Sequence, residues 1–299
     1  MQKPYVAVVG GVNLDLCGRP AQKLILQDSN PGTVTYSSGG VGRNIAHDLR
    51  LLGEEVSFLT VFGDDFYGTI LRNGCLDLGM DLSGAERVSG KSTSSYLYIT
   101  DDRGEMKLAV SDMEIIRAIT PEWLSERENI LNGASAVAVD GNLMPEALSW
   151  IAEHCAAPVF ADPVSVTKAE RLRPILPKLH TFKPNLTEGQ HLTGETEPEA
   201  VVSSLLALGV QRVYLSLGAQ GILAGEGEER VLLPCYPTNL VNTTGGGDAV
   251  MAALIWAHLR GLGLTQSTKA ALMAGRITVE HEGTNSPELT SQRLLEAIQ

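Results

Sequence analysis

The chain has 299 residues, of which 43% are hydrophobic and 19% charged, and its formal net charge is −12. This composition is typical of a soluble globular protein with a sizeable core, and the negative charge argues against nucleic acid as the main partner. No apolar run approaches the ~20 residues of a membrane span, and the N-terminus lacks the pattern of a signal peptide, so we expect a cytoplasmic protein with no membrane partner.

The first predicted strand is followed by two polar residues that could bind hydroxyl groups. The run 5–9 is short and apolar, as in a buried strand, and Asn13 and Asp15 follow it. Ligands of open α/β sheets bind beyond the carboxyl ends of the strands, and residues two apart in extended backbone point the same way. A carboxylate and an amide together suit vicinal hydroxyls, although an Asx turn would explain the same pair.

A glycine-rich helix entry comes next. Residues 16–36 are expected to be irregular, apart from a turn at 28–32 and a short strand at 33–36. Gly39, Gly40 and Asn44 then precede a helix through about Leu52, with neither the Rossmann nor the P-loop spacing. The glycines would let a ligand approach the backbone, and Asn44 would face it, but a tight loop packed on the sheet is the alternative.

A strand at 56–61 and a helix through about Leu78 lead to a predicted antiparallel hairpin. Its strands, 93–99 and 106–110, are joined by a polar loop that contains glycine. With the strand at 33–36, the hairpin would form a lid made of segments about 16–36 and 93–111. A lid that excludes water is what a phosphoryl-transfer enzyme needs to favour an alcohol over hydrolysis.

From about Pro121 onward, strands and helices alternate, which predicts a parallel sheet with helices on both faces. Strands at 136–140 and 159–162 end in aspartates, and a strand at 181–183 leads to Asn185 and Glu188 at a helix start. Their spacing is that of a capping box, but the pair could also order water around Mg²⁺, which keeps much of its hydration shell. Four cysteines without CxxC spacing predict reduced thiols.

Three consecutive glycines, Gly245, Gly246 and Gly247, precede Asp248 and an apolar helical run at 249–257. A helix start presents unpaired N–H groups and a positive dipole end, and glycine removes the Cβ that would keep an anion away. This stretch could therefore hold a phosphate or an oxyanion, while Asp248 takes a proton from a nearby alcohol. A flexible turn with an acidic cap is the alternative. Helices at 265–280 and 289–299 complete the chain.

Five motifs in this order resemble the PfkB/ribokinase family of carbohydrate and nucleoside kinases over essentially the whole chain. They are Asn-x-Asp at 13–15, Gly-Gly-x-Gly-x-Asn-x-Ala at 39–46, Asn-x-x-Glu at 185–188, Ser-x-Gly-x-x-Gly at 216–221 and Thr-Gly-x-Gly-Asp at 244–248. The resemblance implies one ribokinase-like kinase domain over 1–299, a three-layer α/β/α sandwich with a mostly parallel central sheet and a small β lid. It also implies phosphoryl transfer from ATP to a sugar hydroxyl, and a homodimer formed through the lid.

The resemblance also implies the roles of individual residues. Asp248 matches the catalytic base, and the three glycines before it match an anion hole. The residues matching the sugar site are Asn13, Asp15, Gly39, Gly40 and Asn44. Those on the ATP side are Lys183, Asn185, Glu188, Ser216, Gly218, Gly221 and Thr244, with Asn185 and Glu188 holding Mg²⁺ through water. Two residues depart from the pattern: Asn242 replaces an aspartate near a monovalent-cation site, which leaves potassium open, and Gly246 replaces an alanine.

Within that family, stretches at 28–32, 39–46, 93–97, 162–165 and 180–185 resemble the pseudouridine kinases. This implies the 5′-hydroxyl of pseudouridine as acceptor, with Asp15 and Asn13 on the ribose 2′- and 3′-hydroxyls. Ser29, Asp112 and Lys168 are candidates for binding the uracil edge, and each could equally be a solvated loop residue. The alternatives are another nucleoside kinase, a ribokinase- or fructokinase-like sugar kinase, or a non-catalytic binding protein, against which the intact Asp248 argues.

Overall fold

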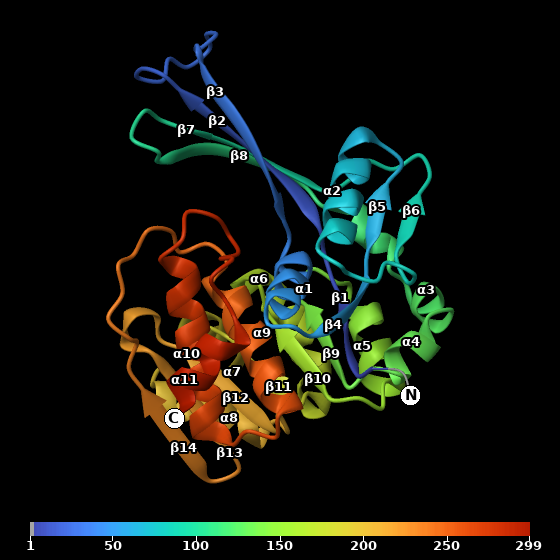
Figure 1. Ribbon diagram of the computed structural model, residues 1–299, viewed down its shortest axis with the longest axis vertical. Helices are drawn as coiled ribbons and strands as arrows, with labels where there is room; N and C mark the ends of the chain where they lie inside the picture. Colours follow the sequence, from blue (N-terminus) through green and yellow to red (C-terminus); the bar gives the residue numbers. More distant parts are fainter. Residues whose placement is uncertain (1–2) are drawn as a thin grey trace.

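The computed structural model describes residues 3–299 and consists of a helix-covered central sheet from which a smaller sheet projects (Figure 1). The central sheet has the strand order β14-β13-β12-β11-β10-β9-β1-β4. Its strands are β1 (Tyr5–Val9), β4 (Glu55–Leu59), β9 (Ala136–Asp140), β10 (Val159–Asp162), β11 (Thr181–Phe182), β12 (Arg212–Ser216), β13 (Ile222–Glu226) and β14 (Glu229–Leu233). All neighbours from β4 to β12 pair in parallel, and β13 and β14 add an antiparallel edge, which confirms the mostly parallel sheet.

Helices cover both faces of this sheet. One face carries α1 (Val41–Leu51), α9 (Gly246–Leu259), α10 (Leu264–Val279) and α11 (Ser291–Ile298). The other carries η1 (Glu114–Ala118), α3 (Pro121–Ser125), α4 (Glu128–Asn132), α5 (Pro145–His154), η2 (Glu170–Lys178), α7 (Leu186–Thr193) and α8 (Pro198–Ala207). A peripheral unit contains β5 (Val61–Gly63), α2 (Phe66–Asp77) and β6 (Glu86–Val88). No helix within residues 3–299 is long and apolar enough to cross a membrane.

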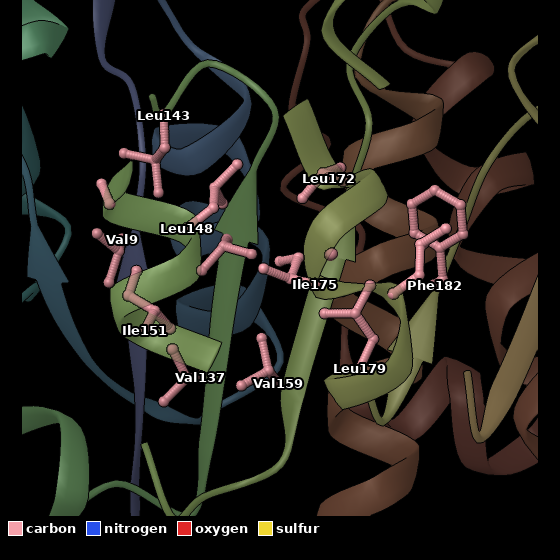
Figure 2. Packing of buried hydrophobic residues seen from close by; sticks show 14 of the residues in the cluster. Val9, Val137, Leu143, Leu148, Ile151, Val159, Leu172, Ile175, Leu179 and Phe182 are labelled. Atoms are coloured by element: carbon pink, nitrogen blue, oxygen red, sulfur yellow. The ribbon is translucent and has the colours of Figure 1, made fainter. Parts of the chain in front are cut away.

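Alternating side chains of the strands build the two halves of the core. Val6 and Val8 of β1 belong to the cluster under α1 and α9, whereas Val9 belongs to the cluster under α5. Figure 2 shows Leu148 and Ile151 of α5 in that second cluster, beside Val9 and Val137. A sheet buried on both faces favours near-continuous apolar runs, and β1 and β9 have such runs. The three-layer α/β/α sandwich is thus confirmed.

The projecting sheet, called the lid sheet below, has the order β3-β2-β7-β8. Its strands are β2 (Asn13–Pro20), β3 (Gly32–Gly39), β7 (Ser95–Thr100) and β8 (Met106–Asp112). The predicted hairpin is present as β7 and β8. The expectation that 16–36 is irregular apart from a strand at 33–36 was wrong for residues 16–20 and for Gly32, because β2 continues to Pro20 and β3 begins at Gly32. Residues 21–31 lie outside both strands, as expected. Gly18-Arg19-Pro20 has weak β-propensity, but its pairing with residues 32–34 of β3 holds it extended.

Candidate active site

Two cavities lie on either side of the glycine stretch 243–247. The lid cavity, of about 340 Å³, is lined by Asn13, Asp15, Gly40, Asn44, Tyr96, Lys168, Thr244, Gly245, Asp248, Thr284 and others. The α10 cavity, of about 640 Å³, is lined by Lys183, Asn185, Ser216, Gly218, Gly221, Thr243, Gly246, Gly247, Arg276 and others. Neighbouring residues of one loop therefore line both cavities. Such a loop can contact two ligands at once.

The stretch 243–247, called the glycine loop below, is shaped by contacts that leave no room for a Cβ. Gly245 has a φ of 84°, in the left-handed region, and α9 begins at the next residue. A Cβ on Gly245 would collide with the backbone oxygen of Thr284. No side chain in the described part of the chain caps this helix start. The N–H groups of the first turn are therefore available to an anion.

Asp248 lies in the first turn of α9 and is only 9% exposed. Asn44 Nδ2 donates a hydrogen bond to Asp248 Oδ2 at 2.8 Å. Burial, reinforced by the negative charge of Asp162, raises the pKa of Asp248 to about 7, although Asn44 and Lys183 lower it. A carboxylate with this pKa can accept a proton from an alcohol near neutral pH.

Lys183 supplies the positive charge beside the glycine loop. Its Nζ forms an ion pair with Asp162 Oδ2 at 2.9 Å, and both side chains are buried. Burial by itself lowers the pKa of Lys183, but the attraction of Asp162, with Glu188 and Asp248, outweighs it and raises the pKa. An ammonium group is thus fixed close to Gly247, where a Cβ would lie 3.4 Å from Nζ.

Asn185 and Glu188 form the capping box of α7. Asn185 Oδ1 accepts from Glu188 N at 2.9 Å, and Glu188 Oε2 accepts from Asn185 N at 2.8 Å. The other carboxylate oxygen of Glu188 takes no part in the capping box, and burial raises the pKa of Glu188. Within residues 3–299 no three His, Cys, Asp or Glu side chains are grouped to hold a metal ion. The site therefore lacks a direct protein cage but fits Mg²⁺ held through water, because this ion uses few carboxylates together with substrate phosphates.

The predicted hydroxyl-binding residues, Asn13 and Asp15, are at the start of β2, at the base of the lid sheet. Asn13 Nδ2 donates to Asp15 Oδ1 at 2.6 Å, and burial raises the pKa of Asp15. Gly39 pairs with Asn13 across β2 and β3, and a Cβ there would collide with the Asp15 carboxylate. Gly40 has a φ of 101° just before α1. The lid cavity thus brings the amide–carboxylate pair together with Asp248.

The three residues predicted to bind the uracil edge lie at different positions relative to the lid cavity. Lys168 lines the lid cavity and donates from Nζ to Asn142 Oδ1 at 2.6 Å. Asp112 is exposed at the end of β8, next to Met113, which lines the cavity. Ser29 is exposed in the β2–β3 loop and does not line the lid cavity of its own chain.

Several residues of the site had no role predicted from the sequence. Asp140 Oδ2 accepts from Gly11 N at 3.0 Å and from Gly42 N at 2.9 Å, which joins β9 to both glycine turns. Asp162, the partner of Lys183, is paired with Asp140 across adjacent strands. Aspartates at the ends of two predicted parallel strands were a usable signal, because such ends meet at one edge of a sheet.

The loop after α10 makes hydrogen bonds that support the site, and no pattern in the sequence predicted these contacts. Asn285 Oδ1 accepts from Arg43 at 2.7 Å, and Asn285 Nδ2 donates to Asp48 Oδ1 at 2.8 Å. Asn242 Nδ2 donates to the Glu282 carbonyl oxygen at 2.9 Å, and Asn242 Oδ1 accepts from Thr244 N at 2.9 Å. The loop is thereby tied to α1 on one side and to the glycine loop on the other.

Known proteins resemble this chain over its whole length. Residues 3–291 match the pfkB family carbohydrate kinases. Pseudouridine kinase of Escherichia coli (strain K12) is 36% identical over 306 aligned residues, which cover 100% of this chain and 97% of the relative. A carbohydrate kinase from Agrobacterium tumefaciens superimposes with a TM-score of 0.86 at 25% identity, over 99% of this chain and 97% of the other. Arabidopsis thaliana ribokinase, solved with ribose and ATP, superimposes with a TM-score of 0.87 at 21% identity, over 100% and 99%.

Proposed function

Because this chain belongs to the pfkB family of carbohydrate kinases, and is therefore a phosphotransferase with an alcohol group as acceptor, we propose that its acceptor is the 5′-hydroxyl of pseudouridine. The product is pseudouridine 5′-phosphate. The observation that carries the proposal is the glycine loop, which lines two cavities at once and has Asp248 on the lid-cavity side. The choice of nucleoside is supported by the 36% identity with the Escherichia coli pseudouridine kinase.

In the proposed complex, the ribose 2′- and 3′-hydroxyls bind Asp15 and Asn13, and the 5′-hydroxyl faces Asp248. Phosphoryl transfer depends mainly on in-line positioning and on neutralising the equatorial oxygens. Asp248 takes the proton of the hydroxyl, while the amides of Gly246 and Gly247 stabilise the transferring group. The ammonium of Lys183 adds positive charge on the same side.

ATP is proposed to occupy the α10 cavity, with its phosphates toward the glycine loop. Ile222, Leu240 and Val250 give this cavity an apolar surface that suits a purine ring, and Ser216, Gly218 and Gly221 line the same cavity. Asn185 and Glu188 order water around Mg²⁺, which neutralises phosphate charge when bound. Potassium is not part of the proposal, because Asn242 itself links the glycine loop to Glu282.

A substrate panel tests the nucleoside assignment. Pseudouridine, uridine, inosine, ribose and fructose are each tested separately in a coupled ADP-release assay. We expect the largest kcat/KM for pseudouridine. Two features favour this result: the lid cavity extends beyond the hydroxyl-binding pair to Val164 and Lys168, and the sequence is similar to a pseudouridine kinase. Turnover of free sugars alone would replace the proposal by a ribokinase- or fructokinase-like activity, which is the second candidate.

The lid sheet has one apolar face, and we infer that a second copy of the chain covers it. Leu16, Tyr36, Leu97 and Val110 are consecutive register partners across the four strands. Asp15 and Tyr96 directly precede Leu16 and Leu97 in their strands, and both line the lid cavity. Because successive side chains of a strand point to opposite faces, the apolar row lies on the face away from that cavity. Tyr36, Leu97 and Val110 are 68%, 43% and 58% exposed, and a contiguous patch of this kind marks an interaction surface. A second lid sheet presents the same patch, as two-fold symmetry requires.

Leu97→Asp is expected to convert this dimer into a monomer, because two carboxylates would be buried at the symmetric interface. Light scattering coupled to size-exclusion chromatography measures the mass directly. Leu208→Asp, at a leucine of similar exposure (44%) at the end of α8, is the matched control and is expected to stay dimeric. A monomeric wild-type protein, or a dimeric Leu97→Asp variant, would contradict the assignment of the interface.

A further inference from the structure

Val164 has a φ of 67°, in the left-handed region that β-branched side chains avoid. Ser165 N donates to the Pro163 carbonyl oxygen at 2.7 Å, so Val164 is the central residue of a γ-turn. Such a conformation is strained for a valine and persists only where surrounding contacts impose it. Gln27, in the exposed β2–β3 loop, is the other non-glycine residue with positive φ in the part of the chain that the structure describes.

The surroundings of the turn explain how this strain is maintained. Asp162 Oδ1 accepts from Val164 N at 2.8 Å, and the Asp162 carbonyl oxygen accepts from Gly141 N at 2.8 Å. Ser165 then caps the short helix α6 (Val166–Ala169) by accepting from Lys168 N at 3.4 Å. The turn is therefore anchored at both ends, by Asp162 at the end of β10 before it and by α6 after it.

The turn contributes a distinct part of the lid cavity. Val164, Met113 and Ile116 line it with apolar atoms, next to the polar pair Asn142 and Lys168. Asn142 Oδ1 accepts the hydrogen bond from Lys168 Nζ, which leaves both side chains with N–H groups to donate. Burial lowers the pKa of Lys168, as expected for an ammonium group partly enclosed by the cavity. An apolar surface with donors beside it is complementary to a flat ring that carries carbonyl groups.

We propose that Val164, Asn142 and Lys168 form a subsite for a carbonyl-bearing heterocycle attached to the sugar, with Val164 as its specificity-determining residue. The inference rests on the proposed function, because only a nucleoside acceptor carries such a ring. Glycine would adopt the same φ without strain, so what valine adds at this position is its isopropyl group. A free pentose occupies the hydroxyl-binding part of the cavity and leaves this subsite empty.

Val164→Gly separates this role from a structural one. Relief of the strained φ is expected to keep the melting temperature at or above that of the wild type, whereas most valine-to-glycine changes lower it. The ratio of kcat/KM for pseudouridine to kcat/KM for ribose is expected to fall by about tenfold, since the ring loses its apolar contact. Val166→Gly, two residues further on in α6, is the matched control and is expected to lower the melting temperature without changing the ratio.

Lys168→Met provides a second readout that does not depend on the backbone, and we expect it to lower the same ratio by removing the donor to a ring carbonyl. An unchanged ratio in both variants, with a wild-type enzyme that phosphorylates nucleosides, would overturn the subsite and leave the proposed function standing. A wild-type enzyme that phosphorylates ribose but no nucleoside would overturn both. A fall in the ratio in Val164→Gly at an undiminished melting temperature would support the subsite.

Discussion

Asp248→Asn is expected to lower kcat by about 10³-fold, within the range of roughly 10²–10⁴ for loss of a general base, while nucleoside and ATP still bind. The asparagine has the same shape, and its amide oxygen can keep the hydrogen bond from Asn44 Nδ2. It cannot accept the proton that leaves the hydroxyl. Steady-state kinetics and calorimetric titration of both ligands measure the two effects separately. An unchanged kcat would remove Asp248 from the role of base.

The pH dependence of the same enzyme gives an independent test. The base must be ionised, and burial raises the pKa of Asp248 to about 7, so kcat/KM should rise as pH increases through about 7 and level off above it. The hydrogen bond from Asn44 lowers that pKa, so Asn44→Ala should move the rise to higher pH. Asp248→Asn should remove the rise, whereas a wild-type profile that is flat from pH 5 to 9 would contradict the assignment.

The parts of this site that the sequence predicted are those whose geometry is determined locally. Gly245 and Asp248 lie at a helix start, where three glycines and an apolar run specify both the turn and the first helical residues. Asn185 and Glu188 satisfy each other within one turn of helix, so their spacing alone specified the contact. Asp140 and Asp162 were recognised only as the ends of two predicted strands, and no role in the site was predicted for either of them.

What the sequence could not predict depends on contacts between distant segments. Asn285 meets Arg43 and Asp48 across separations of 242 and 237 residues, and no local pattern connects them. The strained φ of Val164 is held by Asp162, which bonds to both Val164 N and Gly141 N, against the preference of valine itself. The extension of β2 to Pro20 likewise comes from its pairing with β3. In each case tertiary contact overrides local propensity.

The second large effect is expected from the glycine loop, where Gly245→Ala should lower kcat by about 10²-fold and also destabilise the protein. A left-handed φ costs an alanine about 1–2 kcal/mol, and its Cβ would displace the Thr284 backbone that borders the lid cavity. A shift of about 1 Å in a group that positions the transferring phosphoryl can by itself cost about 10²-fold in rate. Kinetics and thermal unfolding record both effects.

Gly246→Ala, one residue further on, is the matched control that separates loop shape from the loss of a glycine. Gly246 has no positive φ, and a Cβ there would lie 2.9 Å from Cγ1 of Val279, so this methyl group, rather than backbone, would have to move aside. Its N–H group is retained, and alanine favours the first turn of a helix. We therefore expect near-wild-type kcat and stability for Gly246→Ala. Equal losses in the two variants would mean that the loop needs glycine for flexibility, and not for the left-handed turn at Gly245.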